Sequence, residues 1–369
     1  MTVTSKKAAR CVVAIPARNE ETVIDACLHA LARQQEMADD ILLLVNNTTD
    51  RTVEIARRMV GRIGSRLHVE EVTLPPAQAN AGCARRLAMD RAAALAGSQG
   101  VLLTTDADGQ VPAYWVARNL AWLRAGHDAV CGMAAIDPVD EAAIPAHLIA
   151  DDRAETRYTE LIDEIDHLVD PRLWDPWPRH THHSGASIAV RSAVYLAVGG
   201  LPEVSHGEDR GFIERLERRD CKIRRDPGLT VIVSGRRVGR AHGGMADTIA
   251  RRIIVQDIWA DDRLEMPQAA LRRAQLRGDA RAVWSSHLDC RFLASRLMLP
   301  VAALEGMMCC PWFGDAWAVI EAASPVLKRR PIAMARLNAG IRQAEPMLRQ
   351  LQQETITQTR FGMMQACAE

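Results

Sequence analysis

The feature that most constrains the fold is an alternation of short apolar runs with helical patterns over the first 135 residues. The expected strands are the apolar runs Cys11–Ile15, Ile41–Val45 and Val101–Thr105, together with the more polar segment Leu67–Val72. Between the first two, apolar residues recur at three- and four-residue spacing from Val23 to Leu31, which is typical of an amphipathic helix. Such an alternation predicts parallel strands joined by crossover helices.

Polar loops follow three of these expected strands, at 16–20, 46–50 and 106–110. Asn19 is the expected cap of the first helix, and Thr49 or Asp50 is expected to start the second. In open parallel sheets, ligands bind in a crevice at the carboxyl ends of the strands. The sequence therefore predicts that the three loops converge on one crevice.

Two carboxylates stand one residue apart directly after the fourth expected strand, in Asp106-Ala107-Asp108. Carboxylate oxygens are the ligands that Mg²⁺ and Mn²⁺ prefer, and such an ion can be held against a diphosphate. Taken alone, the pattern is weak, because similar pairs are common in solvated turns. Its position at a strand end favours a metal site.

A second acidic pair, Glu208-Asp209, precedes an expected helix that buries Phe212, Ile213 and Leu216. Asp209 can be explained as a plain helix cap with Glu208 as its solvated neighbour. The alternative is that one of these carboxylates acts as a general base, which removes a proton from an attacking hydroxyl group.

In this order and spacing, the motifs over about residues 11 to 245 resemble a family 2 glycosyltransferase of the GT-A fold. The matching segments are Ile15–Glu21, Asn46–Asp50, Asp106–Asp108, Gly185–Ala186, Val198–Pro202 and Gly207–Asp209. The resemblance implies an α/β fold with a doubly wound, mainly parallel sheet and flanking helices, followed here by a mostly helical C-terminal extension. It also implies metal-dependent transfer of a sugar from a nucleoside-diphosphate sugar to an acceptor hydroxyl.

The resemblance also implies roles for individual residues. Contacts to the base and ribose of the donor would come from Pro16, Ala17, Arg18, Asn19, Glu20, Asn46 and Asp50. Asn46 is a departure, since family members more often carry an acidic residue there, and this leaves UDP and GDP donors open. Arg85 would lie near the diphosphate, although a surface arginine on an amphipathic helix explains it equally well.

For the reaction itself, the resemblance implies that Asp108 binds Mn²⁺ or Mg²⁺ and that Asp106 faces the donor and the metal. His242, after the last expected strand, would complete the metal shell, with an ordinary loop histidine as the alternative. Asp209 is the preferred base and Glu208 the second choice. Direct displacement would invert the anomeric carbon, and retention stays open.

The expected domain organisation is a glycosyltransferase domain over residues 1–246 and a helical region over 247–369. Within the first, the donor half spans about 11–135 and the acceptor half about 136–246. Residues 137–183, rich in Pro, Asp, His and Trp, are expected to form an irregular connection over the site.

Other nucleotide-dependent classes fail on specific residues. No G-x-G-x-x-G follows the first strand, no Gly-Lys pair of a P-loop exists, and the loop at 16–20 is not the glycine-rich loop of a nucleotidyltransferase. A non-catalytic nucleotide-sugar-binding or regulatory protein on the same fold is the remaining alternative. The presence of all four acidic residues of the two pairs favours catalysis.

Composition limits the partners. Lys plus Arg equals Asp plus Glu at 46 each, so no net basic field attracts nucleic acid. The nine cysteines are scattered and without a C-x-x-C pair, which is typical of reduced thiols and predicts a cytoplasmic protein. No transmembrane segment is expected, because charges and prolines interrupt the apolar stretch at 292–312, which stays a candidate for peripheral membrane contact.

The acceptor has no motif that identifies it. Four clustered arginines of the C-terminal region, Arg272, Arg273, Arg277 and Arg281, are best explained as one solvated helical face. A homodimer interface, a cover for the acceptor site and contact with anionic lipid headgroups are the alternatives for this region.

Overall fold

The structure, a computed structural model of the chain, describes residues 9–236 and 245–366. It divides the chain into two compact units. The first, here called the sheet unit, comprises Met1–Ala143, His182–Glu217 and Cys221–Arg251. The second, the helical unit, comprises Ile144–Thr181, Arg218–Asp220 and Arg252–Glu369. The helical unit therefore takes in a segment that lies well before the boundary at residue 246 suggested by the sequence.

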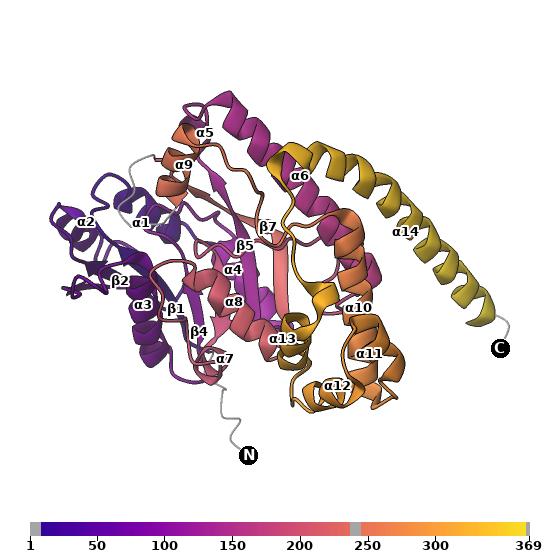
Figure 1. Cartoon of the computed structure of the whole chain (residues 1–369). Helices are drawn as coiled ribbons and strands as arrows, with labels where there is room; N and C mark the ends of the chain where they lie inside the picture. The colour runs from indigo at the N-terminus through magenta and orange to yellow at the C-terminus, as the bar shows by residue number, and fades with distance from the viewer. Residues whose placement is uncertain (1–8, 237–244, 367–369) are drawn as a thin grey trace, which may run out of the picture. The chain divides into compact units, whose positions relative to one another are not determined.

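The sheet unit contains a seven-stranded, mainly parallel sheet (Figure 1). Its strands are β1 (Cys11–Ala17), β2 (Asp40–Asn46), β3 (Arg66–Val72), β4 (Val101–Thr104), β5 (Ala129–Ile136), β6 (Ile188–Arg191) and β7 (Ile223–Val233). They lie in the order β3-β2-β1-β4-β6-β5-β7, and β6 runs antiparallel to both of its neighbours. With the helices described below, this confirms the expected α/β fold with a mainly parallel sheet and flanking helices.

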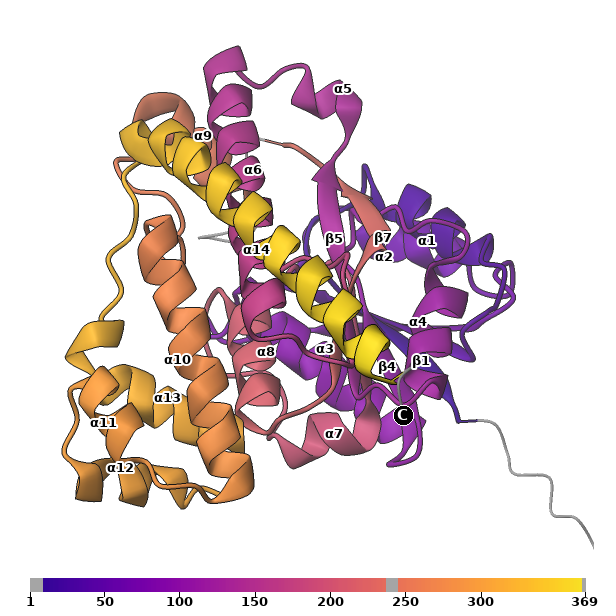
Figure 2. The ribbon, with the colours of Figure 1, turned by 90° about the vertical axis from the view of Figure 1, so that its right-hand side faces the viewer.

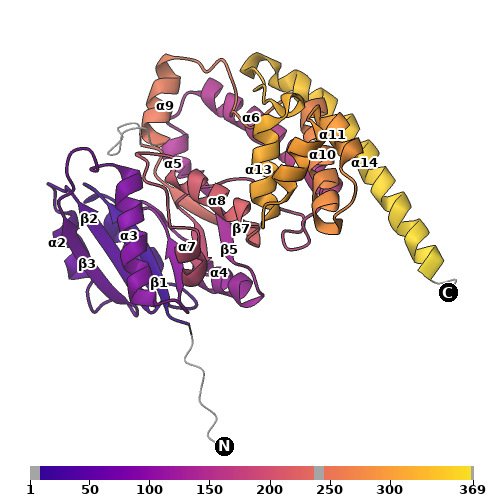
Figure 3. The same ribbon diagram turned by 60° about the horizontal axis from the view of Figure 1, so that its bottom comes forward.

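Helices cover both faces of this sheet. One face packs against α1 (Ile24–Ala32), α2 (Thr52–Arg58) and α4 (Trp115–Arg124), and the other against α3 (Ala81–Ala96), α7 (Ser192–Ala197) and α8 (Glu208–Arg218). Figure 3 shows α3 lying along β1 and β2. Each face has its own hydrophobic core. Because side chains alternate across a strand, Val13 and Ile15 enter the core beneath α1, α2 and α4, while Val12 and Ala14 enter the core beneath α3, α7 and α8. Both cores hold the strand ends, and thus the loops after them, in place.

The first loop differs from its expected local structure. Asn19 does not cap α1, which begins at Ile24 without a side-chain cap. Instead Asn19 has a φ of 54°, and its Oδ1 accepts a hydrogen bond from the Thr49 backbone N–H at 2.8 Å. The prediction fails because the Asn19 side chain connects two loops rather than satisfying its own helix.

The expectation of an irregular connection over 137–183 is wrong. The segment contains the short helix α5 (Pro138–Glu141) and the 24-residue helix α6 (Ala146–Val169). Tyr158, Leu161 and Ile165 recur along α6 at helical spacing and are buried. Nine Asp, Glu and Arg residues lie among the other positions of α6 and obscure this stripe in the sequence.

The helical unit has two small cores. Its further elements are α10 (Pro267–Ser286), α11 (Arg291–Leu297), α12 (Val301–Met308), α13 (Phe313–Ala323), η1 (Pro325–Leu327), η2 (Met334–Arg336) and α14 (Leu337–Ala366), while α9 (Met245–Ile254) leads into the unit. One core joins α10 to α13, and the other joins α6 to α14, which cross in Figure 2. No helix in residues 9–236 or 245–366 is long and apolar enough to cross a membrane.

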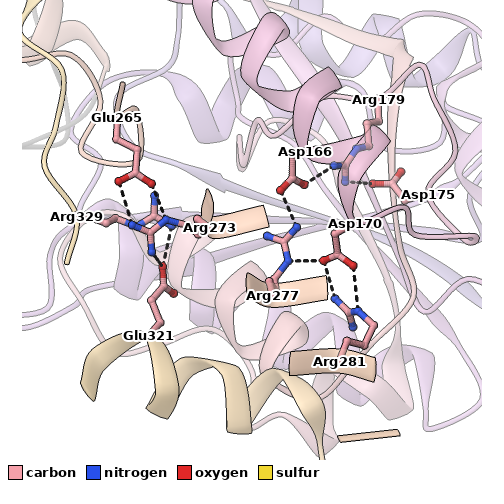
Figure 4. A network of polar contacts seen from close by, with 10 residues as sticks. All are labelled: Asp166, Asp170, Asp175, Arg179, Glu265, Arg273, Arg277, Arg281, Glu321 and Arg329. Carbon is pink, nitrogen blue, oxygen red and sulfur yellow. Dashed lines mark hydrogen bonds and ion pairs between the residues drawn. The ribbon is translucent and has the colours of Figure 1, made fainter. Parts of the chain in front are cut away.

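Three of the four clustered arginines form ion pairs inside the helical unit (Figure 4). Arg273 binds Glu265 and Glu321 and donates to the Leu327 carbonyl. Arg277 donates to Asp166 at 2.6 Å and to Asp170 at 2.5 Å, and Arg281 binds Asp170 as well. Only Arg272 among the four is exposed, so the expected solvated face is wrong. The three arginines join α10 to segments up to 111 residues away in sequence.

Replacing Arg277 by Met is expected to lower the free energy of unfolding by about 3 kcal/mol, because Asp166 and Asp170 then lose a shared cation in a buried position. Arg272→Met on the same helix is the matched control and is expected to change it by less than about 0.5 kcal/mol. Urea denaturation followed by circular dichroism measures both. Equal values for the two variants would show that the network contributes nothing to stability.

Candidate active site

The loops at the carboxyl ends of the strands of the sheet unit surround a pocket of about 390 Å³. Ten of the predicted site residues line it, namely Pro16, Ala17, Arg18, Glu20, Asn46, Arg85, Asp106, Asp108, Glu208 and Asp209. They come from the ends of β1, β2 and β4, from α3 and from the start of α8. The structure thus brings together residues that are up to 193 positions apart in the sequence.

Two predicted donor-binding residues, Asn19 and Asp50, are not among the residues that line the pocket. Asn19 binds the second loop through Thr49. Asp50 accepts hydrogen bonds from the backbone N–H groups of Glu21 at 3.0 Å and of Thr52 at 2.9 Å. Both side chains therefore hold the first and second loops together behind the pocket wall.

Arg85 is buried at the base of the pocket and is not a surface arginine. Its Nε donates to Glu208 Oε1 at 2.9 Å, and its remaining nitrogens donate to the Gly185 carbonyl, Thr104 Oγ1 and Asp106 Oδ1. Burial alone would lower the pKa of Arg85, but Asp106 and Glu208 raise it above its ordinary value. The guanidinium joins the two acidic motifs in one ionic cluster.

Gly185 makes room for this cluster. A Cβ at position 185 would lie 2.6 Å from Arg85 Cζ, closer than side-chain carbons approach one another. The motif Gly185-Ala186 in the sequence therefore has a steric reason, because a larger residue would displace the Arg85 guanidinium from its carboxylates.

Arg236, three residues after the end of β7, was not predicted from the sequence. It donates two hydrogen bonds to the Glu20 carboxylate, at 2.7 and 2.9 Å, and its Nη2 lies 3.6 Å from Asp108 Oδ2. Burial lowers the pKa of Arg236, but Glu20 and Asp108 together raise it above the ordinary value. The only signal in the sequence was its place after the last expected strand.

The two carboxylates before α8 have different surroundings. Glu208 is buried and ion-paired with Arg85. Asp209 accepts backbone hydrogen bonds from Gly185 at 2.9 Å and Arg210 at 2.7 Å. Burial, together with the charge of Glu208, raises the pKa of Asp209 above its ordinary value although Arg85 opposes this. By environment, Asp209 is thus more basic than an ordinary aspartate.

Among the described residues that line the pocket, carboxylates outnumber guanidinium groups, and this excess of negative charge suits a divalent cation. The lining includes five carboxylates, those of Glu20, Asp106, Asp108, Glu208 and Asp209, and the three guanidinium groups of Arg18, Arg85 and Arg236. Burial and the neighbouring Asp106 raise the pKa of Asp108 to about 6, while Arg236 opposes the shift. A cation bound to Asp108 would relieve this unfavourable charge.

Asp106 and Asp108 do not by themselves form a complete metal shell. In the part of the chain that the structure describes, no group of three or more His, Cys, Asp or Glu side chains is arranged to hold a metal ion. His242 lies outside the described residues. The observed residues fit an ion held by one or two carboxylates, with its other positions open to a ligand such as a diphosphate.

A family model described as glycosyl transferase family 2 matches residues 12–175. Over these residues the chain is similar to glycosyl transferase family 2. The match includes the loops after β1, β2 and β4, with both Asp106 and Asp108. The match ends before Glu208, so the placement of the second acidic pair beside Asp106 and Asp108 rests on the pocket itself.

Three solved structures are similar to this chain. TarS residues 1–349 from S. aureus, in complex with UDP, is 14% identical over 94% of this chain and 92% of that one, with a TM-score of 0.44. The mannosyltransferase PcManGT from Pyrobaculum calidifontis, with GDP-Man and Mn²⁺, is 16% identical over 85% and 74%, with a TM-score of 0.43. Glucosyl-3-phosphoglycerate synthase from Mycobacterium tuberculosis, with Mn²⁺, UDP and phosphoglyceric acid, is 15% identical over 68% and 82%, with a TM-score of 0.42. No curated protein matches the chain.

Proposed function

We propose that this glycosyltransferase moves a sugar from a nucleoside-diphosphate sugar to an acceptor hydroxyl, with a divalent metal at Asp108 and Asp106 and with Asp209 as the base. The observation that carries the proposal is that these three carboxylates line the same pocket at the carboxyl ends of the strands. Departure of the nucleoside diphosphate needs a positive charge close to it, and proton removal needs a carboxylate close to the acceptor hydroxyl. The carboxylates of the pocket can hold the metal ion for the first step and act as the base in the second.

Donor binding is assigned to the side of the pocket formed by the first two loops. Arg18, whose Nη1 donates to the Ala79 carbonyl, and Asn46, at the end of β2, line this side. The neutral Asn46 amide carries both a donor and an acceptor, so it can pair with the edge of uracil or of guanine. UDP- and GDP-linked sugars are therefore both candidate donors.

Asp108 is the main metal ligand in this proposal. Its side chain is 12% exposed, whereas Asp106 Oδ1 is already occupied by Arg85. When bound, Mn²⁺ or Mg²⁺ would stabilise the negative charge that develops on the departing nucleoside diphosphate. Arg85 fixes the direction of the Asp106 carboxylate and thereby limits how both acidic side chains can approach a cation.

Asp209 is assigned as the base because Glu208 is neutralised by Arg85 while Asp209 is not directly ion-paired with it in the described contacts. The acceptor oxygen forms the new bond to the anomeric carbon, and its proton passes to the Asp209 carboxylate. The bond from the anomeric carbon to the diphosphate breaks, and the diphosphate leaves with the electron pair. A single displacement of this kind inverts the anomeric carbon, which NMR of the product measures.

The decisive test is calorimetric titration of UDP and GDP into the protein with Mn²⁺ and with a chelator. We expect one nucleotide to bind about tenfold or more tightly with Mn²⁺, since a shared ion links the carboxylates to the diphosphate. Asp108→Ala is expected to remove this metal dependence. Metal-independent binding in the unaltered protein, or an unchanged Mn²⁺ effect in Asp108→Ala, would contradict the metal assignment.

A further inference from the structure

Arg236 lines the pocket beside Asp108, and hydrogen bonds hold its backbone in place. Its backbone N–H donates to Ser234 Oγ at 3.2 Å. Ser234 Oγ and the Gly235 backbone N–H in turn donate to Asp140 Oδ2, at 3.1 and 2.7 Å. The residues just before the guanidinium are therefore anchored to α5, and its position near Asp108 has a structural cause.

We propose that Arg236 is an internal counterion that shares Asp108 with the divalent metal, so that it lowers the metal affinity of the free protein and couples metal binding to donor binding. The proposal rests on the metal assignment of the proposed function. It makes Arg236 a positioning residue, because it acts on the metal and the diphosphate through Asp108 and Glu20.

The competition follows from charge and distance. Arg236 Nη2 lies 3.6 Å from Asp108 Oδ2, and the Asp108 side chain is 12% exposed. In such a partly buried site, a guanidinium beside the carboxylate offsets the attraction that a metal ion would otherwise gain, and two neighbouring cations repel each other. Metal binding to the free protein must overcome both effects.

Glu20 sets the strength of this competition. It holds both terminal nitrogens of Arg236 in a bidentate pair and is itself 5% exposed. The pair keeps Arg236 beyond hydrogen-bonding distance from Asp108. Without the Glu20 charge, Arg236 would be free to close on Asp108, and the site would also lose one of its negative charges. Both changes disfavour a metal ion.

The charge of the donor also affects metal binding. A nucleoside diphosphate brings negative charge to the pocket, which offsets the repulsion between Arg236 and the metal. By thermodynamic linkage, a donor that tightens metal binding is tightened by the metal to the same degree. The arrangement therefore favours occupancy by metal and donor together over metal alone.

Mn²⁺ titrated alone into the nucleotide-free protein tests this inference without any activity measurement. We expect Arg236→Gln to bind Mn²⁺ about tenfold more tightly than the unaltered protein, because a competing charge is removed, and Glu20→Gln to bind it about tenfold more weakly. Arg91→Gln, in a partly exposed pair with Glu70 on the sheet unit, is the control and should leave the affinity unchanged. The two variants remove opposite ends of one ion pair, and the expected changes in Mn²⁺ affinity have opposite signs. A purely structural role of the pair would instead weaken Mn²⁺ binding in both variants.

Weaker or unchanged Mn²⁺ binding by Arg236→Gln would overturn the inference, provided that Asp108→Ala still abolishes binding. If Arg236→Gln does not fold, Arg236→Lys is the second variant. It keeps the charge but not the bidentate pair, so Mn²⁺ binding no tighter than in the unaltered protein is expected, and tighter binding would contradict the charge argument. Mn²⁺ binding that is independent of Asp108 would instead overturn the proposed metal site, and the inference with it.

Discussion

Asp209→Asn is expected to lower the rate of sugar transfer by about 10²- to 10⁴-fold, the usual contribution of a general base. The amide keeps the size of the side chain and can still accept the hydrogen bond from Gly185, but it cannot take up the acceptor proton. Donor affinity is therefore expected to change by less than about twofold, since proton removal belongs to the transition state. Initial rates and calorimetric titration of the donor nucleotide measure the two quantities separately.

The pH profile gives this prediction a second readout. A base works in its ionised form, and burial with the neighbouring Glu208 raises the pKa of Asp209 above its ordinary value. The rate of transfer should thus be maximal at pH values above the raised pKa and should fall as the pH drops through it. This fall should occur at a higher pH than for an unperturbed aspartate. The residual activity of Asp209→Asn should lack this acid limb.

Glu214→Gln is a suitable control, because Glu214 lies on α8 outside the pocket lining and is largely exposed. It is expected to leave rate, affinity and pH profile unchanged. Full activity in Asp209→Asn would move the base to Glu208 or to another group. Loss of donor binding in that variant would show that Asp209 holds the donor rather than the acceptor.

The sequence was most informative where function depends on strand ends. Runs such as Ile41–Val45 predict buried parallel strands, and the loops after them must then meet at one edge of the sheet. The structure places Asp106 and Asp108 in one pocket with residues from the ends of β1 and β2, as this rule predicts, and Asp209 joins them from the start of α8. These inferences succeed because they need only local patterns and a general rule of sheet topology.

The features that the sequence did not predict depend on distant partners. Arg236 pairs with Glu20 across 216 positions, and no local pattern marks either residue as a member of that pair. The run Ile188–Arg191 has the same composition whether it pairs parallel or antiparallel, so the direction of β6 follows only from its neighbours β4 and β5. The arginines of α10 looked solvated because their acidic partners lie outside α10. Asp166 lies on α6 and Asp170 directly after it, whereas Glu265 and Glu321 lie elsewhere in the helical unit.

Arg85→Met is expected to lower the free energy of unfolding by about 3 to 5 kcal/mol and to abolish transfer, because it leaves a buried Glu208 carboxylate without its cation. The loss is larger than for an exposed pair, since Arg85 and Glu208 are each less than a tenth exposed. Urea denaturation of the unaltered protein and the variant measures the difference.

Arg91→Met provides the control on the same helix α3. Its pair with Glu70 is more than a third exposed on both sides, so its removal is expected to cost about 1 kcal/mol or less. Equal costs for the two arginines would contradict the structural role of the Arg85 cluster.

The double variant Arg85→Met/Glu208→Met separates the two contributions to the cost. If most of the loss comes from an uncompensated charge, removing the charge as well should recover part of the stability even though an ion pair is gone. If stability recovers but transfer does not, the ionic cluster is needed for activity as well as for stability. The reason would be that Asp106 still lacks the guanidinium that orients it. No recovery would mean that packing of the Arg85 side chain against Gly185, rather than charge, holds this part of the pocket together.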